Sequence, residues 1–197
     1  MFTWLLRRTW IALIASTACS PSAWVKSEVE PTLVDRRRAG IEVIDALVRV
    51  ADPLIRSQPA VASAAGPKVV AFVGIDNFSA EELSENQESL YEKLDTILSR
   101  QSSYTLLSRH YVESVLRSRG MRTSDLLLPA GRDEFAAVVR AEGLVPDVLI
   151  HGTLTSASSE GIAEREREYQ LTLEWIDAYT GRQVAKESTR VRKSYRK

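Results

Sequence analysis

The side chains that most often carry out catalysis or hold metal ions are scarce in this sequence. It contains one cysteine, Cys19, and two histidines, His110 and His151. A structural zinc site of four cysteines, or of two cysteines and two histidines, is therefore impossible, and so is a disulfide within the chain. The sequence also lacks the G-x-S-x-G, P-loop and G-x-G-x-x-G motifs. We therefore expect no enzymatic activity, no metal ion and no cofactor.

The best remaining candidates for chemistry are carboxylates. Residues 76–95 carry seven acids and a single cation, Lys93. Two carboxylates can hydrolyse a glycosidic bond when one of them is desolvated and keeps its proton, so a glycan hydrolase is the alternative from the enzyme class. Because most of these acids fall off the apolar face of a predicted helix, we favour a solvated acidic face. Ser194 and Lys197 match S-x-x-K, but they end the chain, where no helix can hold one against the other, and we interpret the match as chance.

The chain begins with a pattern typical of an export signal. Arg7 and Arg8 precede a short apolar core, and small residues lead to Cys19. Small residues followed by cysteine resemble the bacterial lipobox, although Ser16 stands where leucine is usual. In proteins with this motif the cysteine receives a diacylglycerol and becomes the new N-terminus. We therefore predict that residues 1–18 are a signal peptide and that Cys19 is lipidated.

Two other interpretations of this segment remain open: a secretory signal with an incidental cysteine, and twin-arginine export through Arg7-Arg8. The uncharged run over 9–25 is too short and too polar for a transmembrane helix, which needs about 20 apolar residues. Ser20 follows the cysteine, where aspartate would resemble an inner-membrane retention signal. We therefore expect an outer-membrane anchor and a domain that faces the periplasm.

The rest of the chain has the composition of one globular domain. Hydrophobic residues make up 44% of the 197 residues, and 26 basic side chains balance 26 acidic ones. A formal net charge of zero argues against a nucleic-acid partner, since such proteins carry a basic excess. Removal of residues 1–18 takes away two arginines and no acids, which leaves the remainder slightly acidic.

Hydrophobic periodicity predicts the elements of the domain. We expect residues 19–40 to form the lipidated N-terminus and a tether, residues 41–192 to form the domain, and residues 193–197 to form a basic tail. Helices are expected over 41–56, 79–100, 108–119 and 133–142, and strands over 68–75, 104–107, 147–155, 168–178 and 183–192, the last at a sheet edge. This order predicts an α/β (α+β) sandwich in which a small mixed sheet ends in an antiparallel three-strand meander and is packed by helices.

Two polar segments are candidates for binding. The stretch 120–133 is predicted to be a long loop between two helices, a place where a rigid scaffold presents contact residues. Its charged residues Arg122, Asp125 and Arg132 are the candidate partner contacts. The C-terminal stretch 190–197, which carries five cations and includes the basic tail, is either a frayed, solvated end or a site of attraction to an anionic envelope polymer or an acidic partner face.

Four segments in a fixed order resemble the LpoB-type lipoprotein activators of bifunctional penicillin-binding proteins. They are a valine-rich strand that leads to Asn77-Phe78-Ser79, the strand Tyr104-Thr105-Leu106-Leu107-Ser108, the strand Pro146-Asp147-Val148-Leu149-Ile150-His151-Gly152, and the turn Ile176-Asp177-Ala178-Tyr179-Thr180-Gly181. The resemblance covers about residues 41–192. It implies a non-enzymatic, lipid-anchored protein whose partner is a bifunctional peptidoglycan synthase, with no small-molecule substrate.

The sequence departs from that family at two points. Val184-Ala185 stands where a tryptophan often follows the threonine-glycine turn, and residues 20–38 reach only about 65 Å when fully stretched. A module of another envelope or secretion system on the same fold is therefore the alternative function. A pore of the related curli type is not expected, because the chain lacks the additional long amphipathic hairpins that build a barrel.

Overall fold

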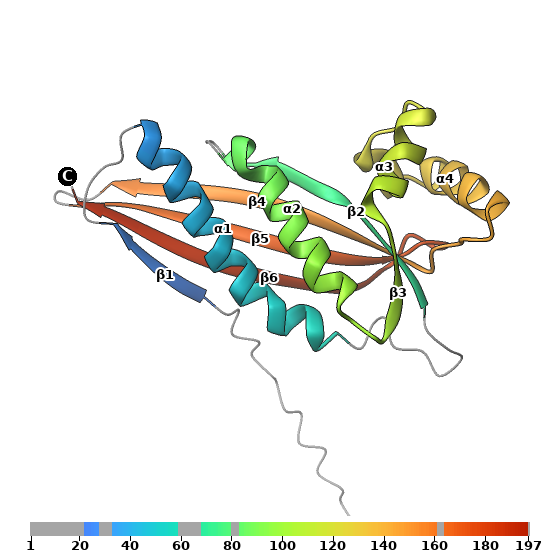
Figure 1. Ribbon diagram of the computed structural model, residues 1–197, viewed down its shortest axis with the longest axis horizontal. Coiled ribbons are helices and arrows are strands. Elements are labelled where there is room, and N and C mark those ends of the chain that lie inside the picture. The colour runs from blue at the N-terminus through green and yellow to red at the C-terminus, as the bar shows by residue number, and fades with distance from the viewer. Residues whose placement is uncertain (1–21, 28–32, 59–67, 80–82, 161–163, 197) are drawn as a thin grey trace, which may run out of the picture.

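The computed structural model describes residues 22–27, 33–58, 68–79, 83–160 and 164–196 (Figure 1). The strands in these ranges are β1 (Ser22–Ser27), β2 (Lys68–Phe78), β3 (Tyr104–Leu107), β4 (Val148–Glu160), β5 (Glu164–Asp177) and β6 (Gln183–Arg196). The helices are α1 (Leu33–Arg56), α2 (Leu83–Ser99), α3 (Arg109–Ser118) and α4 (Pro129–Ala141), with the 3-10 helix η2 (Thr123–Leu127) between the last two.

One mixed sheet of six strands runs through the described part of the chain, in the order β1-β6-β5-β4-β2-β3. The strands β4, β5 and β6 form an antiparallel meander, whereas β2 pairs in parallel with both β3 and β4. The edge strand β1 pairs in parallel with β6, with Ser22 opposite Arg190. The expected fold class is confirmed.

Helices α1 and α2 cover one face of the sheet (Figure 1). Because side chains of a strand alternate between faces, every second residue of the meander points into this layer. Its buried residues include Val148, Ile150 and Leu154 of β4, Leu171, Leu173 and Trp175 of β5, and Ile44, Leu47, Leu90 and Leu94 of the two helices. The alternation over 168–178 thus correctly predicted a strand with one buried face.

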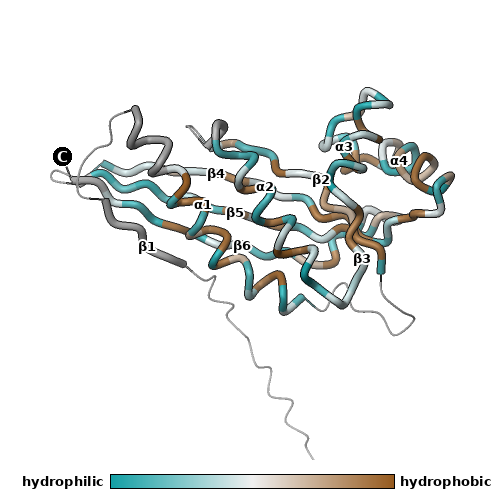
Figure 2. The backbone as a smooth tube through the Cα atoms, viewed as in Figure 1, coloured by the Kyte–Doolittle hydropathy of each residue, from teal (hydrophilic) through white to brown (hydrophobic). Residues whose placement is uncertain are grey.

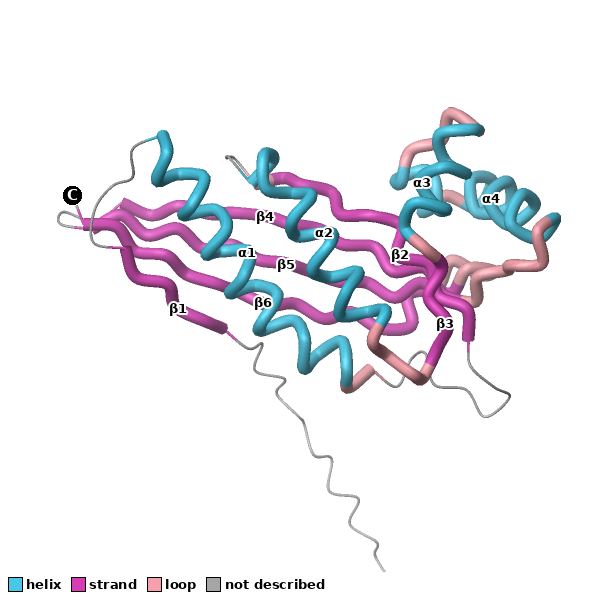
Figure 3. The backbone as a smooth tube through the Cα atoms, in the orientation of Figure 1, coloured by secondary structure: helices cyan, strands magenta, loops and turns pink. Residues whose placement is uncertain are grey.

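Of the described residues, those of α3 and α4 cover the opposite face, and they do so at one end (Figure 3). Here Ala71, Val73 and Leu149 of the sheet pack against Val112, Leu116, Leu126, Phe135 and Val139 of the helical segments. The strands β4, β5 and β6 extend well beyond this cover, and their far ends are hydrophilic (Figure 2). Exposed or half-buried polar residues such as Thr155, Glu174 and Arg190 occupy that uncovered part.

Four local expectations were wrong. The residues expected to form a tether contain β1 and the first turns of α1. Residues 156–160, beyond the strand expected to end at residue 155, continue β4. β6 lies between β1 and β5 rather than at an edge and extends to Arg196, past the predicted end of the domain. Lys193, assigned to the basic tail, is fully buried in this strand, because its neighbours in the sheet and α1 enclose it.

Candidate functional site

The candidate contact residues lie together at one end of the molecule, where η2 connects α3 to α4 (Figure 1). The expected long loop was therefore wrong: η2 occupies its middle, and α4 already begins at Pro129. Proline suits the first position of a helix because its missing N–H would have no intrahelical partner there. The segment is consequently held by regular backbone hydrogen bonds.

Asp125 fixes the first turn of η2. Its Oδ2 accepts a hydrogen bond from the backbone N–H of Arg122 at 2.7 Å, and its own N–H donates to the Arg122 carbonyl at 3.0 Å. The Arg122 side chain itself is exposed. Of this pair, Asp125 shapes the backbone and Arg122 presents a charge to solvent.

Gly131 lets the first turn of α4 lie directly on η2. A Cβ atom at this position would stand 2.1 Å from the carbonyl oxygen of Asp125, so no larger residue fits without a shift of the backbone. The two short helical segments are thereby held in one arrangement.

Arg132 is buried, with 7% of its surface exposed. Its Nη1 donates a 2.8 Å hydrogen bond to the carbonyl of Leu127 and lies 3.5 Å from that of Leu126. The guanidinium also fills the space in front of Gly181, where an added Cβ would come within 2.3 Å of Nη2. The residue proposed from the sequence as a surface contact instead connects η2 to the turn between β5 and β6.

The turn that receives Arg132 is itself held by Asp177. Its Oδ1 accepts hydrogen bonds from the Thr180 N–H at 2.7 Å, the Thr180 hydroxyl at 2.8 Å and the Tyr179 N–H at 3.1 Å. Burial acts to raise the pKa of Asp177, but the hydrogen bonds from Thr180 and Tyr179 and the charge of Lys68 outweigh it and lower the pKa below its ordinary value. The turn is therefore rigid and polar on its inner side.

Three large apolar residues remain exposed on these fixed segments: Leu127 at 40%, Leu128 at 60% and Tyr179 at 60%. Together with Arg122 they are called the end surface below. Tyrosine and arginine are enriched among binding hot spots, although leucine is not, and a pre-ordered backbone loses little conformational entropy when it binds. The sequence analysis missed Leu127, Leu128 and Tyr179, although three consecutive leucines before a proline in a predicted polar loop were a visible signal.

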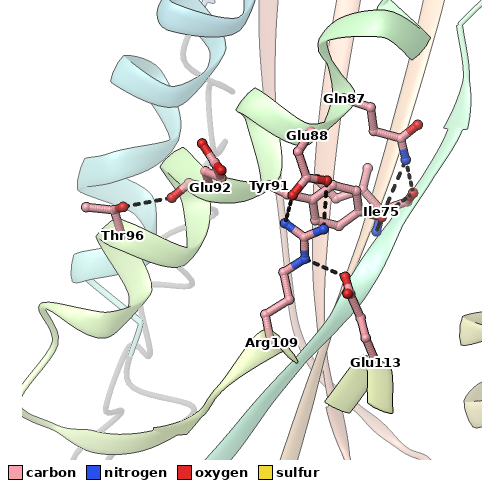
Figure 4. Close-up of polar contacts among 8 residues, drawn as sticks. All are labelled: Ile75, Gln87, Glu88, Tyr91, Glu92, Thr96, Arg109 and Glu113. Carbon is pink, nitrogen blue, oxygen red and sulfur yellow. Dashed lines mark hydrogen bonds and ion pairs between the residues drawn. The ribbon is translucent and has the colours of Figure 1, made fainter. Parts of the chain in front are cut away.

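A second cluster connects α3 to α2 (Figure 4). Arg109 donates to both carboxylate oxygens of Glu88 at 2.8 Å each and, through Nε, to Glu113 at 2.6 Å. Its Cζ lies 4.4 Å from the centre of the Tyr91 ring. The hydrogen bond and charge of Arg109 lower the pKa of Glu88, and those of Glu88 and Glu113 raise the pKa of Arg109.

Tyr91 connects this cluster to strand β2 of the sheet. Its hydroxyl accepts a hydrogen bond from the N–H of Ile75 and donates to the carbonyl of the same residue at 2.9 Å. Ile75 follows the bulge in β2, at which the pairing with β4 shifts between Phe72 and Gly74. Since β3 pairs with residues 68–71 of β2, Tyr91 satisfies backbone groups of Ile75 that none of the described strands reaches.

Two of the carboxylates of 76–95 are in structural contacts. Glu88 is paired with Arg109, and Asp76 lies 3.3 Å from His151 Nε2 on the same face of the sheet. Asp95 differs, because burial raises its pKa. Asp95 is half-buried, and its burial depends on packing that the sequence pattern does not show.

The two histidines lie apart: His110 is exposed on α3 and His151 is buried in β4. Among the described residues, no group of three or more histidine, cysteine or acidic side chains could hold a metal ion. Cys19 lies outside the described residues, so its lipidation stays a prediction. Within the ranges that the structure describes, none of the helices is long and apolar enough to cross a membrane.

Comparison with solved structures finds bacterial lipoprotein domains. The chain is similar to the LpoB C-terminal domain from Salmonella enterica, with a TM-score of 0.48 and 17% identity over 71% of this chain and 93% of that one. It is likewise similar to lipoprotein GNA1162 from Neisseria meningitidis (TM-score 0.49, 17% identity, 65% of this chain and 84% of that one). The LpoB C-terminal domain from Escherichia coli gives a TM-score of 0.47 and 14% identity over 70% and 91%. No protein-family model matches the chain, and no curated protein matches it significantly.

Proposed function

We propose that this chain is a lipid-anchored, non-enzymatic activator of a bifunctional peptidoglycan synthase of the penicillin-binding protein class. The observation that carries the proposal is the end surface, in which Leu127, Leu128 and Tyr179 stay exposed on a backbone fixed by Asp125 and Arg132. The kind of partner is inferred from the four sequence segments that resemble those of LpoB-type activators.

Activation follows from differential binding. A protein that binds one conformation of its target better than another shifts the target toward that conformation, and only by the ratio of the two affinities. A pre-ordered contact surface suits this task, because little conformational entropy is lost when it binds. The end surface therefore stabilises the polymerising conformation of the synthase without any turnover of its own.

Lipidation of Cys19 places this activity at the envelope, with the domain on the periplasmic side of the outer membrane. Several acyl chains anchor a protein stably, whereas a single chain gives only marginal binding. Cys19→Ser is expected to release the chain from the membrane fraction. Retention of the variant with unchanged electrophoretic mobility would contradict lipidation.

The test of function is a glycan-polymerisation assay on lipid-linked precursor in detergent, with the full lipidated chain and each bifunctional synthase of the same cell. We expect one synthase to polymerise faster, and we expect the chain alone to release no product from precursor or sacculi. Failure to stimulate any of these synthases would overturn the proposal. Release of glycan fragments from sacculi by the chain alone would favour the hydrolase alternative.

A further inference from the structure

The predicted lipid anchor, Cys19, is followed almost directly by the first strand of the sheet, so no long tether separates the two. Only two residues separate Cys19 from Ser22, the first residue of β1, and this connection spans at most about 10 Å between the two Cα atoms. β1 is the terminal strand of the sheet, and Ser22 pairs with Arg190 of β6. A lipid on Cys19 would therefore hold the β1–β6 edge of the sheet against the membrane.

The strand next to that edge carries a row of cations. Lys186, Arg190 and Arg192 are separated by even numbers of residues, so they lie on one face of β6, and their side chains are 51%, 44% and 43% exposed. Val191 and Lys193, which alternate with them, are buried beneath α1. The row, called the β6 basic row below, thus lies on the face of the sheet that α1 and α2 leave open.

The acids of β5 on the same face, Glu166, Glu168 and Glu174, lie one strand further from the edge. Glu174 of β5 pairs with Lys186, and Glu168 pairs with Arg190 and Arg192. The contact to Arg190 is 3.8 Å long, beyond hydrogen-bonding distance. The backbone of β5 lies about 4.8 Å further from the β1 edge than the backbone of β6. An anion that approaches from this edge therefore reaches the cations on the side away from their paired carboxylates.

We propose that the β6 basic row binds the phosphate groups of anionic phospholipids in the membrane that holds Cys19. The proposal rests on the lipidation of Cys19 put forward above. Lipid-anchored proteins commonly combine acyl chains with nearby basic residues, since the negative potential of an anionic leaflet attracts cations within about a Debye length. The domain then lies along its own membrane and does not extend from it on a tether.

This arrangement fixes where a partner can bind. β1 lies along the half of β6 that is farther from α3 and α4 (Figure 1), and its first residue, Ser22, is opposite Arg190 in the middle of β6. The end surface is therefore separated from the anchor by the part of the sheet that contains residues 183–190 of β6. A synthase must reach it close to the anchoring membrane.

The test uses the full lipidated chain in vesicles of phosphatidylethanolamine, with or without phosphatidylglycerol, that contain headgroup-nitroxide lipid. Cys19 is the only cysteine and its thiol is consumed by the lipid, so a fluorophore can be placed on Ser188→Cys in β6 or, as a reference, on Ser124→Cys in η2. We expect the nitroxides to quench the β6 probe more than the η2 probe, and to quench it most with phosphatidylglycerol present. Equal quenching of both probes, or no dependence on phosphatidylglycerol, would overturn the proposal.

A pair of triple variants checks the role of the basic row. Lys186→Gln, Arg190→Gln and Arg192→Gln together should lose the extra quenching that phosphatidylglycerol gives. Arg117→Gln, Arg119→Gln and Arg140→Gln remove the same charge from exposed positions of α3, its C-terminal end and α4, and should keep it. If both triple variants lose this extra quenching equally, the effect depends on net charge and not on the β6 basic row, and the proposal is wrong. Circular dichroism checks that the row variant folds. If it does not fold, the wild-type chain is measured at high salt, which must remove the extra quenching that phosphatidylglycerol gives.

The outcomes separate this proposal from the proposed function. A chain that does not enter vesicles overturns the anchor and the membrane contact together. Stimulation of the synthase is measured in detergent, where no bilayer is present, so it succeeds or fails independently of the β6 basic row.

Discussion

The guanidinium of Arg109 lies over the ring of Tyr91, with 4.4 Å between Cζ and the ring centre. Arg109 begins α3, Tyr91 lies in α2, and the Tyr91 hydroxyl is hydrogen-bonded to Ile75 in β2. One side chain thus connects the helix layer on one face of the sheet to the helical segments that carry the end surface on the other. Cation–aromatic contacts of this kind are most favourable when the cation is partly desolvated, and only 14% of the Arg109 side chain is exposed.

Arg109→Met should destabilise the fold. The substitution removes two charge-assisted hydrogen bonds to Glu88 and one to Glu113, but both carboxylates stay in contact with water, so we expect a loss of about 1–2 kcal/mol. Urea unfolding followed by circular dichroism measures it. Arg117→Met, at an exposed position of the same helix, should change the free energy of unfolding by less than about 0.5 kcal/mol.

The same pair should make this effect depend on pH. Arg109 lowers the pKa of Glu88 below 4.5 in the folded chain, so the stabilisation is present above the unfolded pKa and is lost as the pH falls through the lowered folded pKa. The difference between the wild-type chain and Arg109→Met should therefore shrink as the pH falls below 4.5. A difference that stays constant down to the acid unfolding limit would show that packing on Tyr91, rather than charge, holds the cluster together.

Hydrophobic patterns within single segments predicted the helices and strands. The positions of the candidate contact residues, in contrast, depend on contacts between segments that are distant in the sequence. The β-branched run at the start of β2 and the alternation of β5 both indicate strands without any tertiary information. The burial of Arg132 could not be predicted in this way, because it depends on Gly181 of the turn between β5 and β6 coming within contact distance. β1 was missed for a related reason: a segment of only six residues is a strand here because it pairs with the edge of β6.

Gly131→Ala should disturb η2. The added methyl would stand 2.1 Å from the Asp125 carbonyl oxygen, which is backbone and cannot swing away. Overpacking of this kind costs about 1–3 kcal/mol even though alanine favours helices. Thermal unfolding should show a lower midpoint, while Ala137→Ser, at an exposed position of α4, should change it little. An unchanged midpoint for Gly131→Ala would mean that η2 and α4 are not held in contact.

Asp95→Asn should stabilise the chain at neutral pH. Burial raises the pKa of Asp95 above 3.8, which means that the folded state disfavours the charged form and that stability is lost as the pH rises through the folded pKa. Asparagine carries no charge, so its advantage should appear above that pKa and vanish below 3.8, where both side chains are neutral. Glu92→Gln, at an exposed position of the same helix, removes one charge as well and should give no comparable gain. A gain that persists below pH 3.8 would point to a hydrogen bond of the amide instead.

Leu128→Ser should reduce stimulation of the synthase without unfolding the chain. Leu128 is 60% exposed at the junction of η2 and α4, so its truncation removes little core packing, but burial of a leucine in a partner interface contributes about 1.5–3 kcal/mol. The concentration of chain needed for half-maximal stimulation should therefore rise by about tenfold or more. Phe78→Ser is the matched control, because Phe78 is 69% exposed at the end of β2, away from the end surface, and should leave that concentration unchanged. If Phe78→Ser weakens stimulation and Leu128→Ser does not, the contact lies on the open face of the sheet, and the assignment of the end surface is wrong even though activation itself stands.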